Sequence, residues 1–189
     1  MRTVFLLLAA TIGFGQNGAP ITQAERIQWA AAASVGAPNL AAGVFTSAVS
    51  TALNRPPEYG THWEGYGKRQ ALRLTGTTTS ALMEAELGAL WGEDPRYRRA
   101  TVTSPSGRVW HAVKTAFLSY DRNGHPMPAY ARLIAVPASN VIANSWRPDS
   151  EHTANQTMTR IGLGFVSRIA ANSFAEFWPD VRELLRRKK

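Results

Sequence analysis

The sequence predicts an all-α protein: a compact bundle of about five to six helices with small residues at the helix interfaces, and a short β-hairpin near residues 109–127 as the alternative to one helix. Two observations predict this fold. Four segments carry small residues at every fourth position, and residues four apart lie on one face of a helix. Residues that favour helix starts precede these segments, and glycine or proline follows them.

The first two helices are expected between residues 22 and 53. Thr22 to Glu25 form a capping box, and Gly36-Ala-Pro38 ends the first helix. The second is expected over residues 40–53, with Asn39 as its N-cap. Residues 27–54 contain no charged side chain and are long enough to cross a bilayer, but the break at 36–38 favours two helices.

The middle of the chain alternates loops and helices. Residues 56–68 combine glycines with aromatics and are expected to form a loop, followed by a helix over 68–91 that Gly92 ends. Ser104-Pro105 then starts a segment over 107–118. This segment is favoured as a helix, although a strand that turns at residues 121–124 into a hairpin fits the same pattern.

The last third predicts two further helices. One is expected over 128–146 with a kink at Pro137, and a longer one over 156–178 that Pro179 breaks. Asp180 is then expected to cap a short basic helix.

Small-residue stripes let helix backbones approach closely, which is how helices pack in membranes and in some soluble bundles. Arg160 and Arg168 lie within the last helix, and an arginine at a bilayer centre costs about 2.5–3.5 kcal/mol. These arginines favour a helix in the interface plane over a span, although embedded helices stay an alternative. The stripes are Gly43, Ser47 and Thr51; Gly76, Ser80 and Gly88, interrupted by Glu84; Ala131, Ala135, Ser139 and Ala143; and Ser167, Ala171 and Ala175, with Gly164 nearby.

Residues 1–15 are expected to be a secretory signal peptide, because a positive start precedes a short apolar run and small residues at 13 and 15. Residues 16–189 then form a single helical domain with a basic tail over 182–189. The chain has no cysteine and a formal net charge of +8. An exported basic protein is unlikely to meet nucleic acid, so the expected partner is an anionic lipid or envelope polymer surface.

Two groups of residues are candidates for ligand or surface contact. Aromatic faces and positive charges suit headgroups or glycans. The candidates are Trp63, Tyr66, Lys68 and Arg69 in the glycine-aromatic segment, and Arg96, Tyr97, Arg98 and Arg99 in the arginine cluster.

Catalytic chemistry has weaker signals. Glu64, Glu93 and Asp94 are the only candidates for a carboxylate pair in acid–base work, with Asp94 as a helix cap as the competing interpretation. The four histidines do not occur at metal-ligand spacing, and no phosphate-binding glycine loop is present. The sequence therefore predicts no metal and no cofactor.

Three motifs together resemble a family of exported proteins of acidobacteria. They are Glu64-Gly-Tyr-Gly-Lys-Arg69, Asp94-Pro-Arg-Tyr97 and Glu176-Phe-Trp-Pro-Asp180, and the resemblance covers about residues 40–181. That family has no assigned activity, so the resemblance implies no catalytic residue. This chain has Arg98 where relatives tend to place an aromatic.

The sequence favours a non-enzymatic envelope protein, in the periplasm or at the outer membrane, associated with a membrane surface through basic clusters and closely packed helices. The alternative is a lipid- or glycan-acting hydrolase that uses the carboxylates. A small-molecule carrier is a third interpretation, and the closely packing helices would also suit a homo-oligomer.

Overall fold

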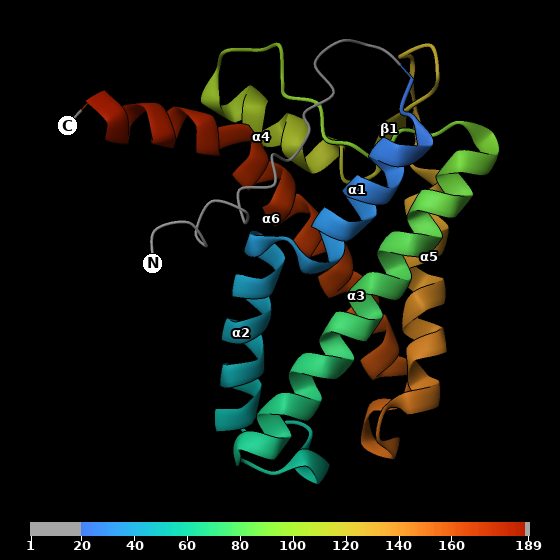
Figure 1. Ribbon diagram of the computed structural model, residues 1–189, viewed down its shortest axis with the longest axis vertical. Coiled ribbons are helices and arrows are strands. Elements are labelled where there is room, and N and C mark those ends of the chain that lie inside the picture. Colours follow the sequence, from blue (N-terminus) through green and yellow to red (C-terminus); the bar gives the residue numbers. More distant parts are fainter. Residues whose placement is uncertain (1–19, 188–189) are drawn as a thin grey trace.

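The computed structural model describes residues 20–187, and these form a helical bundle with a two-stranded antiparallel sheet (Figure 1). The predicted fold class is confirmed. The predicted signal peptide lies outside the described residues. The α-helices and strands are α1 (Gln23–Val35), α2 (Ala37–Ala52), α3 (Trp63–Trp91), α4 (Pro105–Lys114), β1 (Leu118–Tyr120), β2 (Pro126–Pro128), α5 (Tyr130–Ile142) and α6 (Ala154–Arg187). Three short 3₁₀ helices are η1 (Pro57–Tyr59), η2 (Ala143–Trp146) and η3 (Asp149–Glu151).

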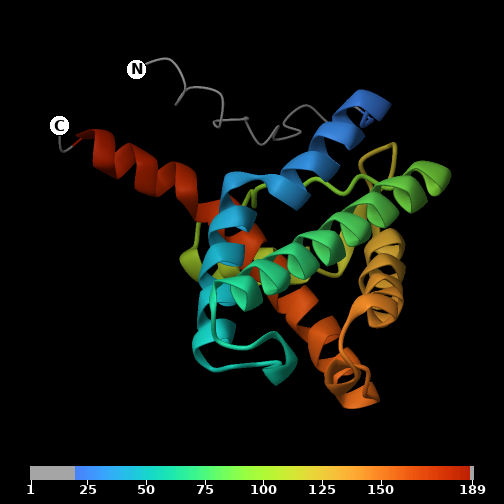
Figure 2. The ribbon, with the colours of Figure 1, turned by 60° about the horizontal axis from the view of Figure 1, so that its bottom comes forward.

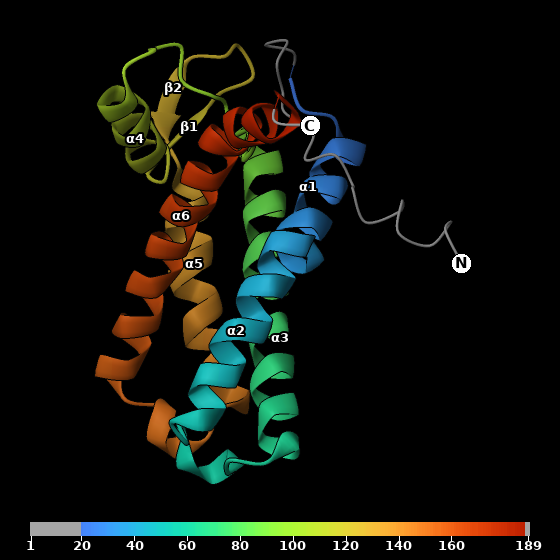
Figure 3. The ribbon, with the colours of Figure 1, turned by 90° about the vertical axis from the view of Figure 1, so that its left-hand side faces the viewer.

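Helix α3 is the central element, because it packs against α1, α2 and α5, while α6 packs against α4 and α5. Figure 2 shows α3 between α2 and α5. Helices α2, α3 and α5 and most of α6 follow the long axis (Figures 1 and 3). We call the end with α4 and the hairpin the cap end, and the end with residues 53–62 and 143–153 the loop end. The start of α1 and the end of α6 both lie at the cap end.

The first helix begins as predicted. The Thr22 hydroxyl accepts the Glu25 N–H, and the Glu25 carboxylate accepts the Thr22 N–H at 2.8 Å, which completes the capping box. The predicted start of the second helix is wrong, since α2 begins at Ala37 with Gly36 as N-cap. Asn39 is not a cap. Its side chain donates to the Ala33 and Ser34 carbonyls and so satisfies the end of α1.

The predicted loop over 56–68 is too long, because α3 already begins at Trp63. The Arg69 guanidinium donates to the carbonyls of Arg55, Pro56 and Gly60 and folds this segment against the first turns of α3. A side chain at Gly65 would lie 2.2 Å from the Tyr59 carbonyl oxygen, so glycine allows the contact. Gly65 thus serves the close packing of the helix start.

Both interpretations of the 107–127 region hold in part. The Ser104 hydroxyl caps α4 through the Gly107 N–H, and the helix ends at Lys114. A hairpin follows, in which Ser119 pairs with Met127. The Asp121 carboxylate accepts the N–H groups of Asn123 and His125, both at 2.8 Å, and closes the turn. Gly92 adopts the predicted left-handed conformation after α3, with φ 79°.

The prediction that Pro179 breaks the last helix is wrong, because α6 continues from Ala154 to Arg187 with Pro179 inside it. Proline removes one backbone hydrogen bond and kinks a helix. The Glu176 carbonyl oxygen, in the turn before Pro179, accepts hydrogen bonds from Arg99 and Arg108 at 3.1 and 2.8 Å. Helix α5 likewise continues through Pro137.

Two of the four small-residue stripes form helix interfaces as predicted. Gly43, Ser47 and Thr51 are the buried residues of α2. The stripe of α5, continued into η2, is buried from Ala131 to Ala143. The other two predictions are partly wrong. Gly76 has no neighbour where a side chain would stand, and Ser167 and Ala171 are exposed on α6.

Candidate functional site

The interior of the bundle lacks large apolar side chains. Among the described residues, every hydrophobic residue that is fully buried is an alanine, for example Ala30, Ala81 and Ala85. The largest fully buried side chains are Glu84, Glu93 and Glu176. Water-soluble domains bury Leu, Ile, Val and Phe and keep carboxylates outside. The polarity of this bundle is therefore inverted.

Many of the large apolar side chains are exposed instead, and others, such as Leu72, Leu87 and Phe165, are half-buried. The four long helices α2, α3, α5 and α6 all carry exposed large apolar side chains, and we call the surface that these form the apolar belt. Its residues are Val44, Phe45 and Val49 on α2; Leu82 on α3; Leu133, Ile134, Val141 and Ile142 on α5; and Leu163, Val166 and Phe174 on α6.

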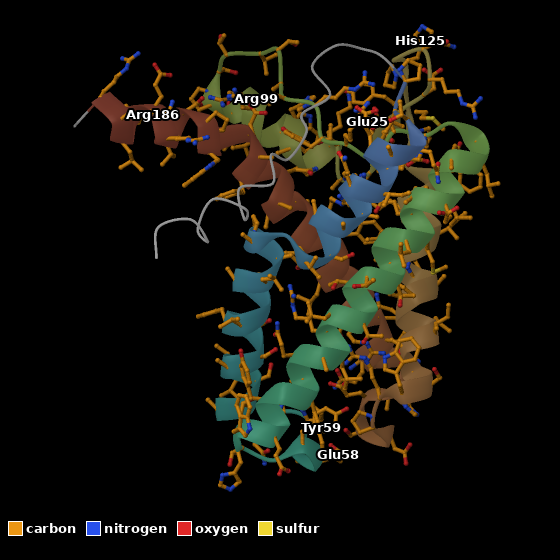
Figure 4. The ribbon with its side chains drawn as sticks, viewed as in Figure 1. Glu25, Glu58, Tyr59, Arg99, His125 and Arg186 are labelled. Atoms are coloured by element: carbon orange, nitrogen blue, oxygen red, sulfur yellow. The ribbon has the colours of Figure 1, made fainter. Side chains whose placement is uncertain are left out.

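Charged residues flank the apolar belt. Figure 4 shows Glu25, Arg99, His125 and Arg186 near the cap end and Glu58 at the loop end. No charged residue occurs in α2, and none occurs in α6 between Arg160 and Arg168.

Exposed aromatic residues mark the ends of the long helices. Trp63 starts α3 at the loop end and is 79% exposed, while Trp91 ends it at the cap end and is 40% exposed. Tyr130 and Trp178 are also exposed at the cap end. Tryptophan and tyrosine prefer the interface between lipid and water.

A buried charge cluster links three helices behind the apolar belt. Glu84 of α3 is 1% exposed and accepts Arg132 Nε of α5 at 2.9 Å and Arg168 Nη2 of α6. The Arg132 guanidinium also donates to the Thr115 and Ala116 carbonyls. Arg168 lies over the Trp29 ring, 5.4 Å from its centroid. These contacts satisfy charges that would otherwise be costly to bury.

A second cluster organises the cap end around Asp94. Its carboxylate accepts Arg96 Nε and Nη2 at 3.0 and 2.9 Å, and it also pairs with Arg98. Arg96 reaches Glu25 of α1 at 3.0 Å. Asp94 is an isolated bridge partner of Tyr120, so the interpretation of Asp94 as a helix cap is wrong.

A third cluster surrounds Glu176 on α6. Its carboxylate accepts Arg108 Nε at 2.6 Å, Tyr97 Oη at 2.9 Å and the Ala100 N–H at 3.0 Å. Burial, followed by the adjacent Glu176 carboxylate, raises the pKa of the Tyr97 hydroxyl, which keeps it a donor. Hydrogen bonds from Arg108 and Arg99 lower the pKa of the Asp180 carboxyl.

The predicted contact residues fall into two classes. Trp63, Tyr66 and Lys68 lie near the surface at the loop end, where the Trp63 and Tyr66 rings stack with centroids 6.3 Å apart. Arg69 is buried and binds loop carbonyls. The arginine cluster is engaged within the molecule, in the contacts of Arg96, Tyr97, Arg98 and Arg99 with Asp94, Glu176 and Asp180.

The three candidate catalytic carboxylates do not converge. Glu64 lies in the first turn of α3, whereas Glu93 and Asp94 follow its last turn, about 40 Å away at 1.5 Å per residue. Glu93 is fully buried and accepts the Ala131 N–H and the Trp91 indole N–H. Glu93 Oε1 and Arg26 Nη1 are buried without a hydrogen-bond partner among the described residues.

A small pocket of about 200 Å³ lies at the cap end between the start of α1 and the end of α3. Arg26, Asp94, Asp121 and Arg122 supply its charged lining. No group of three potential metal ligands occurs in the part of the chain that the structure describes.

Sequence reasoning missed Glu84, Arg132, Arg168 and Glu176. The available signal was a charged residue inside a small-residue stripe, since Glu84 stands between Ser80 and Gly88 and Arg132 follows Ala131. Such a residue faces the neighbouring helix and needs a partner there.

One helical run, Gln23–Ala52 across the bend at Gly36, is long and apolar enough to cross a membrane, and 17% of its most apolar window is buried. By composition alone this is weak support, since signal sequences and core helices share the property. No protein-family model, curated protein or solved structure matches this chain.

Proposed function

We propose that this chain is a non-enzymatic envelope protein whose helical bundle sits in a lipid bilayer, with the apolar belt against the acyl chains. The observation that carries the proposal is the inverted polarity: buried alanines and glutamates inside, exposed leucine, valine, isoleucine and phenylalanine outside. Burying one such side chain is worth about 1.5–3 kcal/mol in water. The apolar belt would make an isolated monomer in water unfavourable.

Membrane packing explains the interior as well. Lipid tails are as apolar as leucine, so helices in a bilayer associate through small residues and polar contacts. The buried faces of α2 and α5 consist mainly of such residues. The sequence argument against a span rested on Arg160 and Arg168. Arg168 pairs with Glu84 inside the bundle, and this pairing removes much of the free-energy cost of placing an arginine within the bilayer.

The length of α3 agrees with a spanning bundle. Helix α3 has 29 residues, which gives about 42 Å between its terminal tryptophans. A bilayer with its headgroups is about 40–45 Å thick. Helix α2 has 16 residues, or about 24 Å, which is shorter than the hydrocarbon core of about 30 Å. We expect local thinning around α2, at a modest cost per ångström.

The compartment stays a prediction from the sequence. The signal peptide and the resemblance to exported acidobacterial proteins support the periplasm or the outer membrane.

The apolar belt also fits partial burial against further copies of the chain, which would reduce the lipid-exposed area.

Fractionation of cells that express the full chain tests the proposal. Because Arg96, Arg98 and Arg99 are engaged in internal ion pairs, we expect neither high salt nor alkaline carbonate to release the protein, and detergent to do so. Release by salt would instead support attachment at the membrane surface. Recovery as soluble protein without any wash would contradict membrane association.

The geometry does not favour the hydrolase alternative. The Asp94 carboxylate is occupied by two arginines, and Glu64 lies at the opposite end of the molecule. The carrier interpretation would need a larger cavity, since ligand pockets usually hold about 300–1,000 Å³.

A further inference from the structure

The end of α6 leaves the bundle. Beyond the kink at Pro179, residues 180–187 run across the long axis of the molecule at the cap end (Figures 1 and 3). Every residue from 181 to 187 is exposed, so no other element in the described part of the chain covers this segment. If the bundle axis follows the membrane normal, this segment lies parallel to the membrane plane.

Two arginines fix the direction of the segment. Asp180, its first residue, pairs with Arg99 Nη2 at 3.0 Å and with Arg108 Nη1 at 2.6 Å. The same arginines bind the Glu176 carbonyl before the kink. The segment is therefore held at a set angle on the body of the protein by contacts on both sides of Pro179.

The segment is amphipathic and basic. Trp178, Val181, Leu184 and Leu185 follow a helical spacing that places them on one side, and all four are exposed, Leu184 by 61% and Leu185 by 58%. Arg182 and Arg186 are one turn apart and border this apolar face, and Arg187 pairs with Glu183. A basic helix with an apolar face that includes tryptophan is typical of the lipid–water interface.

We propose that residues 180–187 form an interfacial helix that binds anionic lipid headgroups. The apolar side chains enter the acyl boundary and the arginines meet the phosphates, whose negative charge they complement. This inference rests on the proposed function, because it takes its orientation from the bundle in the bilayer. It adds the class of lipid that the protein binds. It also assigns the binding of anionic headgroups to the end of α6, because Arg96, Arg98 and Arg99 are paired within the molecule.

Depth measurements on reconstituted full-length protein test the proposal. The chain has no cysteine, so Leu185→Cys or Val44→Cys introduces a single spin-label site, on the segment or on the apolar belt. Each protein is placed in vesicles of phosphatidylcholine alone or of a phosphatidylcholine–phosphatidylglycerol mixture. Paramagnetic relaxation then compares collisions of the label with oxygen, which enters lipid, and with a water-soluble nickel complex.

We expect the label at 185 to move from water into lipid when phosphatidylglycerol is present. Arg182→Gln, Arg186→Gln and Arg187→Gln together should weaken this docking roughly 100-fold, at roughly fivefold for each arginine near an anionic surface. A control with Arg55→Gln, Lys114→Gln and Arg122→Gln removes three exposed positive charges elsewhere and should leave the depth at 185 unchanged.

The outcomes separate the two proposals. If the label at 44 is in lipid while the label at 185 stays in water in both vesicles, the interfacial helix is wrong and the membrane bundle stands. Equal depth at 185 in neutral and anionic vesicles would overturn the role of anionic headgroups. If the label at 44 is in water as well, both proposals fail.

Discussion

Glu84 is a side chain on which three helices converge. It belongs to α3 and pairs with arginines of α5 and α6, so it joins elements that are distant in sequence. Two arginines on one carboxylate leave the cluster with a positive charge, which the Trp29 ring partly offsets. Removing one partner of a buried ion pair destabilises a protein far more than replacing both partners with apolar residues, because it leaves a buried charge unpaired.

We therefore expect Glu84→Gln to lower the free energy of unfolding by about 3 kcal/mol, since it leaves Arg132 and Arg168 without a counter-charge. Denaturant titration of the protein in detergent micelles would measure the change. Glu86→Gln is the matched control, because Glu86 lies on the same helix but is exposed, and its effect should stay within about 0.5 kcal/mol. Equal effects of the two changes would show that Glu84 does not hold the helices together.

At the scale of elements, α3 organises the molecule through its two ends. Its start is pressed against the 57–60 segment, and its end leads through Gly92 into the charged cap. Gly65 and Gly67 lie in the same first turns but in different surroundings. A side chain at Gly65 would meet two carbonyl oxygens at 2.2 and 2.6 Å, whereas one at Gly67 would meet nothing within 4 Å.

This contrast gives a paired prediction. Gly65→Ala should destabilise the protein by about 1–3 kcal/mol, because backbone atoms must shift. Gly67→Ala should be neutral or stabilise by up to about 1 kcal/mol, since alanine favours the helix. Thermal unfolding in detergent distinguishes them. If Gly65→Ala left the thermal stability unchanged, the start of α3 would not be packed against the 57–60 segment.

Sequence patterns predicted which segments are helical better than they predicted where each helix begins and ends. The capping box at Thr22 and the cap at Ser104 depend on residues within one turn, and both are confirmed. The start of α3 and the passage of α6 through Pro179 involve contacts of Arg69 and Arg108 with residues more than two helical turns away in the sequence. The partners of Glu84 and Glu176 likewise lie far away in sequence. Local patterns could not specify those contacts.

At the scale of the whole molecule, the apolar belt and the charged interior oppose the arrangement of a water-soluble domain. Helical periodicity alone shows that each helix has a small-residue face and a large-residue face. It does not tell which face turns inward. The structure settles this for α2, where Gly43 and Ser47 face α3 while Val44 and Phe45 face outward.

A charge placed on the apolar belt tests the environment of that surface. Val44→Lys should lower the membrane fraction, since a lysine at the middle of a bilayer costs about 2.5–3.5 kcal/mol. Val102→Lys is the control, because Val102 is similarly exposed, at 49% against 52%, but lies in the loop before α4. Carbonate-resistant protein in the two variants is the measurement. If Val44→Lys stays in the membrane like the control, acyl chains do not surround α2.

Gln23 and Arg187 both lie at the cap end of the molecule, and this placement has a consequence for the topology. Helices α2, α3, α5 and α6 give four passes along the long axis, an even number, so a bundle that spans a bilayer exposes both ends on one side (Figure 1). Helix α4 and the hairpin share that side. Of the described residues, such a bundle would present 53–62 and 143–153 to the opposite compartment, so antibodies or proteases added there would have these two short targets.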